Sequence, residues 1–311
     1  MVQYAREIPS PRFFEPMKCL PVERLPDGDK WLYEVKWDGY RTLAVRDGKT
    51  ILLYSDRGNS HTEKFPGIVL ALGQLAARRF VLDGEVVALN ENGAPDFQEL
   101  QNWKTTRRPI VYYVFDILHL DGRDLISVTL AERRRVLEKL GKSFREPLML
   151  SEQFRVDVDS FVSGIKARGL EGVVAKRADS VYESGKRSGA WQKKRFGVVE
   201  NFTIGGFVPG PNGVDEILVG DWRAKKLYYI NSVRAGLVQH TRQMLRDALR
   251  PLVTNKCPFV NLPEPPGRTH ALTAEEMKEC VWVRPKLEAE VEYVNRTGGG
   301  RLRHPKFRRL P

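Results

Sequence analysis

A lysine placed where a hydrophobic run meets a turn is the residue of this chain best suited to nucleophilic chemistry. It is Lys36, in the hexapeptide Lys36-Trp37-Asp38-Gly39-Tyr40-Arg41, which closes a run that begins at Trp31. A lysine amine attacks only after losing its proton, and partial burial or a neighbouring cation such as Arg41 favours that loss. The alternative interpretation of the hexapeptide is a surface hairpin, because short motifs often match by chance. The rest of the chain decides between the two.

Five further blocks contain the residue types that phosphate and metal chemistry need. In chain order they are Ser55-Asp56-Arg57-Gly58, Leu82-Asp83-Gly84-Glu85-Val86-Val87, Val114-Phe115-Asp116-Ile117-Leu118, Glu171-Gly172-Val173-Val174-Ala175-Lys176 and Trp191-Gln192-Lys193-Lys194-Arg195. The cations suit phosphate oxygens, and two glutamates beside glycines, Glu85 and Glu171, suit Mg²⁺, which takes one or two carboxylates plus waters and phosphate oxygens. Taken singly, such glutamates are more often exposed turn residues, Phe115 is more often a core aromatic, and a basic run is more often a solvated face.

The six blocks, in this order, resemble the covalent nucleotidyltransferases, and most closely the ligase portion of bacterial ATP-dependent DNA ligases of the end-joining (LigD) type. The resemblance runs nearly end to end and continues between the blocks, as at Phe97-Gln98-Glu99-Leu100-Gln101 and Gly300-Arg301-Leu302-Arg303-His304-Pro305. It implies that Lys36 attacks the α-phosphorus of ATP and carries AMP as a phosphoramidate. The AMP then passes to the 5′-phosphate of a nick, and the 3′-hydroxyl displaces it to close the strand.

The resemblance also implies a set of site residues. The implied catalytic residues are Lys36, Arg41, Lys193 and Arg195, the nucleotide-binding residues are Glu34, Lys36, Arg41, Arg57, Glu85, Phe115, Glu171, Lys176, Lys193 and Arg195, and the ligands for Mg²⁺ or Mn²⁺ are Glu85 and Glu171. By resemblance Phe115 stacks on adenine, Glu85 also contacts the ribose, and Glu34 helps read the adenine amine. Strand alternation predicts that Glu34 shares a face with Lys36, and Lys193 with Arg195.

The chain departs from the family pattern in three places. Asp56 occupies the usual arginine position, so alternation turns the following Arg57 away from the site unless a bulge intervenes. Arg195 replaces a lysine and brings a planar fork, an exchange that we expect function to survive. The basic end of the chain lacks the family's Asp-Lys element, so we expect either slow adenylation or substitution by another basic residue of that end; its members are Arg301, Arg303, Lys306, Arg308 and Arg309.

The composition suits a soluble protein with a polyanionic partner. The 311 residues have a formal net charge of +12 and a pI near 9.6, which predicts binding that weakens as salt rises. No apolar run is long enough for a membrane span and the N-terminus lacks a signal core, so we expect a cytoplasmic protein without membrane contact. Its three cysteines form no CxxC pair, which argues against zinc and against disulfides.

The hydrophobic pattern predicts two domains of the α+β class. The first, residues 1–197, is expected to be an adenylation (nucleotidyltransferase) domain with mixed and antiparallel sheets and helices; the second, residues 198–311, a small all-β OB-fold barrel with one helix near 237–249. Strands are predicted near 31–37, 41–46, 50–55, 80–89, 110–118, 148–154 and 172–176, and helices near 67–79, 96–103, 129–140 and 158–168. Asp47-Gly48 predicts a hairpin between the second and third of these strands. Thr129 with Glu132 predicts a capping box at the start of the third helix, and Gly141 its end. The Pro-rich first thirty residues are expected to wrap the surface, and the junction at 196–201 to act as a hinge.

The leading hypothesis is an ATP- and Mg²⁺-dependent ligase for nicked double-stranded DNA. By resemblance we expect a bacterial, nucleoid-associated activity in repair or end joining, a monomer, and a Ku-type end-binding protein as a possible partner. One alternative is an RNA ligase or a GTP-using capping-type nucleotidyltransferase, against which Glu34 argues and which nucleotide choice would discriminate. The other is a non-catalytic basic DNA-binding relative, suggested by Asp56 and the basic end of the chain but opposed by Lys36, Glu85, Glu171 and Lys193.

Overall fold

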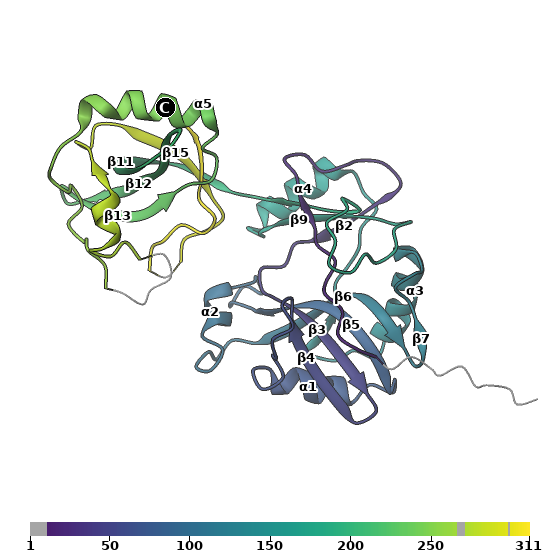
Figure 1. Ribbon diagram of the computed structural model, residues 1–311. Helices are drawn as coiled ribbons and strands as arrows, with labels where there is room; N and C mark the ends of the chain where they lie inside the picture. Colours follow the sequence, from purple (N-terminus) through teal and green to yellow (C-terminus); the bar gives the residue numbers. More distant parts are fainter. Residues whose placement is uncertain (1–10, 266–270, 298) are drawn as a thin grey trace, which may run out of the picture. The chain divides into compact units, whose positions relative to one another are not determined.

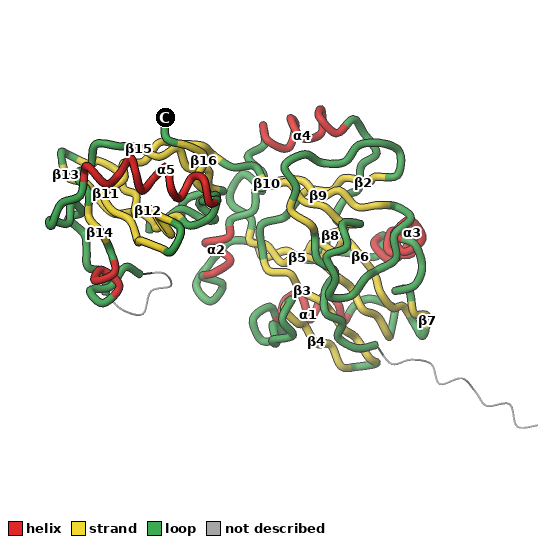
Figure 2. Tube along the Cα trace, turned by 45° about the horizontal axis from the view of Figure 1, so that its top comes forward, coloured by secondary structure: helices red, strands yellow, loops and turns green. Residues whose placement is uncertain are grey.

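The chain divides into two compact units, Met1–Phe196 and Gly197–Pro311. The computed structural model describes residues 11–265, 271–297 and 299–311. Each unit has its own hydrophobic core. Most of the elements of both units are labelled in Figure 1, and Figure 2 colours them by type. In the described part of the chain, no helix has both the length and the apolar character that a membrane crossing requires.

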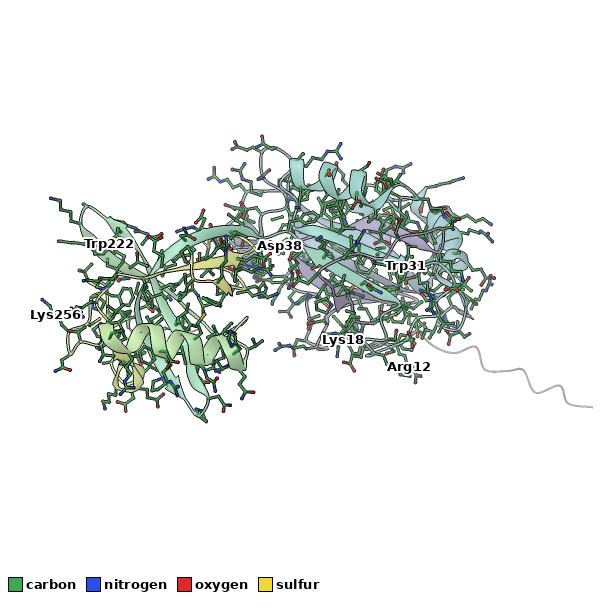
Figure 3. All side chains as sticks on the ribbon, turned by 90° about the horizontal axis from the view of Figure 1, so that it is seen from above. Arg12, Lys18, Trp31, Asp38, Trp222 and Lys256 are labelled. Atoms are coloured by element: carbon green, nitrogen blue, oxygen red, sulfur yellow. The ribbon has the colours of Figure 1, made fainter. Side chains whose placement is uncertain are left out.

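The first unit is built on two sheets. The larger has the order β4-β3-β5-β6-β7, with β8 parallel to β6; its strands are β3 (Tyr40–Asp47), β4 (Thr50–Ser55), β5 (Arg79–Ala88), β6 (Ile110–Leu120), β7 (Arg123–Asp124) and β8 (Leu148–Leu150). The smaller has the order β1-β10-β9-β2; its strands are β1 (Leu20–Pro21), β2 (Trp31–Val35), β9 (Gly172–Arg177) and β10 (Trp191–Arg195). Trp31, at the start of β2, is labelled in Figure 3. The expected mixed and antiparallel sheets are therefore present.

The helices of this unit pack on the outer faces of the two sheets. The inner faces of the sheets lie opposite each other. The helices are α1 (Pro66–Gly73), α2 (Phe97–Gln101), α3 (Leu130–Gly141) and α4 (Val158–Ala167). Ile68 and Leu72 of α1 and Leu137 of α3 share a core with the larger sheet, while α4 packs on β2 and β9, as Figure 1 shows. A third cluster contains Leu43 of β3, Phe115 of β6 and Trp191 of β10, and so fills the space between the sheets.

Local sequence explains where several elements begin and end. The predicted hairpin is confirmed, since Asp47 pairs with Thr50 and Gly48 has φ +61°, a conformation that glycine adopts without strain. The predicted capping box of α3 is also confirmed, because Thr129 and Glu132 bond each other's backbone N–H groups at 3.3 and 3.1 Å. Gly141, expected to stop this helix, is its last residue.

Two predicted elements end four or more residues before the expected position. Helix α1 ends at Gly73 and not near residue 79, because the buried Arg46 guanidinium of β3 takes the carbonyl oxygens of Leu72 and Leu75, at 3.1 and 2.8 Å. The strand expected at 148–154 ends at Leu150, where the chain leaves the larger sheet. Phe154 then pairs with Tyr33 of β2, so residues 148–154 connect the two sheets.

The described part of the first thirty residues does more than wrap the surface. Met17 is fully buried in the cluster between the sheets, and Leu25 is buried beside β2 and β9. Strand β1 extends the smaller sheet by pairing with Gln192 and Lys193 of β10. The expectation of a simple surface wrap was therefore wrong for these residues, since Met17 and Leu25 help to fill the hydrophobic clusters of the two sheets. Residues 1–10 lie outside the described ranges.

The second unit is a small barrel. Its strands are β11 (Val198–Gly210), β12 (Gly213–Arg223), β13 (Lys226–Val233), β14 (Val281–Trp282), β15 (Glu288–Tyr293) and β16 (Lys306–Arg309), in the order β13-β12-β11-β15-β16 with β14 on β11. Ala235, just past β13, forms a parallel bridge with Lys306 of β16, which joins the two edges of the sheet. Helix α5 (Gln239–Leu249) buries Leu245 and Leu249 in the core, and short 3₁₀ turns cover Arg250–Leu252 and Glu276–Glu279.

Candidate active site

The candidate residues lie on the facing surfaces of the two sheets of the first unit. On the smaller sheet, β9 pairs with β2 on one side and with β10 on the other, so that Val174 lies between Glu34 and Lys193. Gly172 lies opposite Arg195, and its carbonyl oxygen accepts the Lys36 N–H at 2.9 Å. Because side chains alternate along a strand, Glu34 and Lys36 share one face with Lys193 and Arg195. On the larger sheet Arg41 pairs directly with Glu85.

Glycines allow the backbone around Lys36 to pack closely. A Cβ atom at Gly39 would lie 2.1 Å from the Val86 carbonyl oxygen, and one at Gly172 would lie 2.2 Å from the Lys194 carbonyl oxygen. No other residue fits these positions without displacing backbone. The turn after Lys36 is thus pressed onto β5, with Asp38 (Figure 3) buried in it.

Lys36 belongs to a set of three charged residues that we call the Glu171 cluster, namely Lys36, Glu171 and Arg195. The Lys36 Nζ donates to Glu171 Oε2, and the Arg195 Nε donates to Glu171 Oε1 at 2.8 Å. Glu171 is nearly buried, with 4% of its side chain exposed, whereas Lys36 is 15% and Arg195 36% exposed. One carboxylate therefore holds the candidate nucleophile and a second cation at the edge of the site.

A second set, the Glu34 cluster, consists of Glu34, Lys176 and Gln153. Glu34 Oε2 accepts from Lys176 Nζ at 2.7 Å and Oε1 accepts from Gln153 Nε2 at 2.5 Å. Glu34 and Lys176 are both 2% exposed. The Lys176 amine lies 4.2 Å from the centroid of the Phe115 ring, which has no directly opposite residue on β5 because the β5–β6 register shifts there. A buried cation, a carboxylate and an aromatic ring thus meet at one place.

A third set, the Arg41 cluster, contains Arg41, Asp83 and Tyr182. The Arg41 Nε and Nη2 donate to the two oxygens of the fully buried Asp83, both at 2.6 Å. The Tyr182 hydroxyl donates to Asp83 at 2.6 Å and accepts the Met17 N–H at 3.0 Å, and burial raises its pKa well above the ordinary range. The guanidinium lies 4.7 Å from the centroid of Phe115. Arg41 is therefore fixed from several sides.

Electrostatics set Glu85 and Lys193 apart from the residues around them. Burial raises the pKa of the Glu85 carboxyl to about 8, because Lys36 and Arg41 do not offset the loss of solvent while Glu171 and Asp83 add negative charge. Burial also lowers the pKa of the Lys193 amine, and the positive charges of Arg195 and Lys36 act in the same direction. The site is thus a region where charged groups lie close together in low dielectric.

Arg57 is the one candidate that the structure keeps apart from the others. The chain turns at Ser55–Gly58, where the Gly58 N–H bonds the Ser55 carbonyl at 3.0 Å and Gly58 has φ +80°. Arg57 is exposed in this turn, so neither strand alternation nor a bulge governs its direction. None of the described contacts of the other candidates involves it.

Three residues of the basic end of the chain are paired within the second unit. Arg301 binds Glu264 and donates to the Ile230 carbonyl at 2.9 Å, Arg308 binds Glu292, and Arg309 binds Glu290 at 2.9 Å. The last two contacts explain how strand β16 tolerates its charge, since Arg308 and Arg309 each bind an acidic residue of β15.

Three residues of the site were not identified from the sequence. Asp83 had a usable signal, since it lies two positions before Glu85 on one strand and so shares its face. Tyr182 and Gln153 had none, because their partners Asp83 and Glu34 are 99 and 119 residues away along the chain.

Comparisons with known proteins follow the division of the chain. The family model described as ATP dependent DNA ligase domain matches residues 16–195, and the one described as ATP dependent DNA ligase C terminal region matches residues 211–310. The multifunctional non-homologous end joining protein LigD of Mycolicibacterium smegmatis is 34% identical over 90% of this chain and 36% of its own length. The protein of that name from Pseudomonas aeruginosa is 35% identical over 97% of this chain and 36% of its own length.

Comparison with a solved structure agrees with these matches for the fold. The mycobacterial DNA ligase D complexed with ATP and MES is 32% identical, with a TM-score of 0.56, over 96% of this chain and 95% of that one. The chain spans about a third of the length of the curated relatives that it matches, at 36%. The likeness to those longer proteins therefore concerns their ligase region.

Proposed function

The chain belongs to the ATP-dependent DNA ligase family, and from that premise we propose that it seals nicks in double-stranded DNA through an AMP group carried on Lys36. The single observation that carries the proposal is the Glu171 cluster, in which the candidate nucleophile lies between two sheets with its amine held by a carboxylate. We assign residues 1–197 as the adenylation domain and 198–311 as the OB-fold domain.

The chemistry consists of three displacements at phosphorus. The Lys36 nitrogen attacks the α-phosphorus of ATP, a P–N bond forms and pyrophosphate leaves. The 5′-phosphate oxygen at the nick then takes the AMP and releases Lys36, and the 3′-hydroxyl oxygen attacks that 5′-phosphate and releases AMP. Each step is an in-line displacement at phosphorus, so it depends on alignment of the reacting atoms and on neutralising the charge of the phosphates.

We assign the cations of the site to the phosphates. Arg41, Lys193 and Arg195 lie on the facing sheet surfaces near Lys36, and the Arg195 guanidinium is partly exposed, so it can turn from Glu171 to an anion. Phe115 and Lys176 are assigned to the base and Glu85 to the ribose, while Arg57 is assigned only to an outer contact because it lies in an exposed turn.

Glu85 and Glu171 fit a divalent cation, Mg²⁺ or Mn²⁺. The supporting observation is that the Glu85 and Glu171 carboxyls lie close enough to interact electrostatically, in a site where burial is the main cause that raises the pKa of Glu85 to about 8. Among the described residues no group of three or more His, Cys, Asp or Glu side chains could hold a metal. A cation here would take its other ligands from phosphate oxygens and water, as Mg²⁺ commonly does. When bound, it would neutralise charge on the phosphates.

The DNA partner follows from charge and from the relatives. The net charge of +12 favours a polyanion, and nicked duplex DNA is the substrate that the proposed chemistry requires. The relatives are named for non-homologous end joining. We propose by analogy a role in bacterial end joining as a nucleoid-associated monomer, with a Ku-type protein as a possible partner.

The test is the intact mass of the protein after incubation with Mg²⁺ and either ATP or GTP. We expect an increase of one AMP with ATP alone, absent in Lys36→Ala, and sealing of a 5′-phosphorylated nick by the wild-type protein only. Sealing by Lys36→Ala from fresh ATP would overturn the assignment of the nucleophile. An adduct from GTP in preference to ATP would favour a capping-type enzyme.

A further inference from the structure

The position of Gln153 is set by the backbone of two segments distant in sequence. Phe154 and Tyr33 exchange two backbone hydrogen bonds, each of 2.9 Å, as an antiparallel pair at the free edge of β2. In that register the next pair along is Gln153 with Glu34, and their side chains meet at 2.5 Å. Ser151, two residues before, accepts the Trp37 indole N–H at 3.0 Å. Residues 151–154 therefore run alongside Glu34, Lys36 and Trp37.

Each oxygen of the buried Glu34 carboxylate has one donor. Gln153 supplies a neutral N–H to Oε1 and Lys176 supplies a cation to Oε2 at 2.7 Å. The Lys176 amine in turn lies 4.2 and 4.3 Å from the ring centroids of Phe115 and Trp191. The cluster thus places an acceptor and a donor side by side next to an aromatic ring that faces the nucleotide in the proposed function.

An acceptor beside a donor distinguishes the two purine edges. Adenine presents an amine donor at C6 and an acceptor at N1, whereas guanine presents an acceptor at C6 and a donor at N1. A carboxylate next to an ammonium complements adenine and opposes guanine at both atoms. Discrimination of this kind relies on repulsion of the wrong base as well as attraction of the right one.

We propose that Gln153 is the positioning residue that holds the Glu34 carboxylate in place as an acceptor and thereby sets the preference for adenine over guanine nucleotides. This inference rests on the proposed function, which places the nucleotide at Phe115. Gln153 fits the role because its amide donates without adding charge. A carboxylate in its place would lie beside Glu34, and two adjacent carboxylates retain a proton between them. That O–H group would be a donor, which guanine O6 accepts.

The experiment compares Gln153→Glu with the wild-type protein, because the substitution keeps the shape of the side chain and changes only its hydrogen bonding and charge. Formation of the Lys36 adduct is followed by intact mass at several concentrations of ATP and of GTP. We expect the ratio of kcat/KM for ATP to that for GTP to fall at least about tenfold, mostly through KM. Gln101→Glu, on the exposed side of α2, is the matched control and should leave the ratio unchanged.

A second variant and a second measurement distinguish failure of this inference from failure of the proposed function. Gln153→Met removes the donor without adding a charge, and we expect a smaller fall of the same ratio. Equilibrium binding of ATP and of GTP, measured by calorimetry, does not depend on covalent chemistry. Wild-type protein that prefers ATP in binding but forms no adduct would refute the proposed covalent chemistry, and a lower ratio of ATP to GTP affinity in the Gln153 variants would then support the inference on nucleotide binding alone. An unchanged ratio in both Gln153 variants, or an equal loss for both nucleotides, would overturn it.

Discussion

The Glu171 cluster and the Glu34 cluster both pair a glutamate with a lysine, yet their surroundings differ. The side chains of Lys36 and Arg195 in the first cluster are 15% and 36% exposed, whereas the side chain of Lys176 in the second is 3% exposed. Partly exposed ion pairs exchange partners at little cost, while either charge of a buried pair left alone costs several kcal/mol. We therefore expect the Glu171 cluster to rearrange around a substrate and the Glu34 cluster to keep its geometry.

Lys176→Met should have the largest effect on stability, because it leaves the buried Glu34 carboxylate without its cation. We expect the free energy of unfolding to fall by about 3 kcal/mol, measured by urea denaturation. Adding Glu34→Gln to this variant removes the unpaired charge and should restore part of the loss. If the single variant loses less than about 1 kcal/mol, the Glu34 cluster is no more fixed than the Glu171 cluster.

Glu171→Gln should affect the rate far more than the fold. We expect Lys36 adenylation to slow about 100-fold, since the variant loses a charged group at the reacting phosphate, while the free energy of unfolding changes by less than about 1 kcal/mol. Single-turnover adenylation and urea denaturation measure the two quantities. Glu275→Gln, in an exposed pair with Lys278, is the control and should change neither. A collapsed unfolding transition in Glu171→Gln would make this cluster structural.

The raised pKa of the Glu85 carboxyl predicts that the stability of the protein depends on pH. The folded pKa of about 8 lies above the ordinary value of 4.5, so the native state holds a proton that the unfolded chain releases. The stability that this proton contributes is present below the unfolded pKa and is lost as pH rises through the folded pKa. Relative to wild type, Glu85→Gln should be nearly unchanged near pH 4.5 and more stable by up to about 5 kcal/mol above pH 8, in buffer without divalent cations.

Arg195→Lys should have the smallest effect, because the side chain is exposed and the charge is retained. We expect the adenylation rate to stay within about threefold and stability within about 0.5 kcal/mol. Arg195→Ala is the comparison that removes the charge, and it should be slower than the lysine variant. A large loss with lysine would mean that the planar fork is essential and that the Glu171 cluster is less adaptable than its exposure implies.

The sequence predicted the parts of the molecule that local chemistry controls. The hairpin at Asp47-Gly48 and the α3 start at Thr129 depend on residues within four positions of each other, and both are confirmed. The α+β fold class and the ligase family are confirmed by the family and structure matches. The roles of the individual site residues stay predictions, although the structure brings nine of the ten nucleotide-binding candidates to the facing sheets and leaves Arg57 in a turn.

Contacts between segments distant in the sequence could not be predicted from local sequence patterns. Gln153 meets Glu34 only because the chain leaves the larger sheet after β8 and pairs Phe154 with Tyr33 of the smaller one. The early end of α1 likewise depends on Arg46 from β3. The spacing of residues along the chain predicts neither contact. The first depends on how residues 151–154 pair with β2, and the second on the burial of the long Arg46 side chain.

Closure of the barrel in the second unit has a consequence for folding during synthesis on the ribosome. Phe307 of β16 is almost fully buried in the core, and the β16 bridge to Ala235 joins the edges of the sheet. The nascent barrel therefore stays open, with β13 and β15 as bare edges, until residues 306–309 have emerged. Unpaired strand edges attract other chains. The first unit draws its elements from residues up to 196, so it completes its core while the second is still being translated.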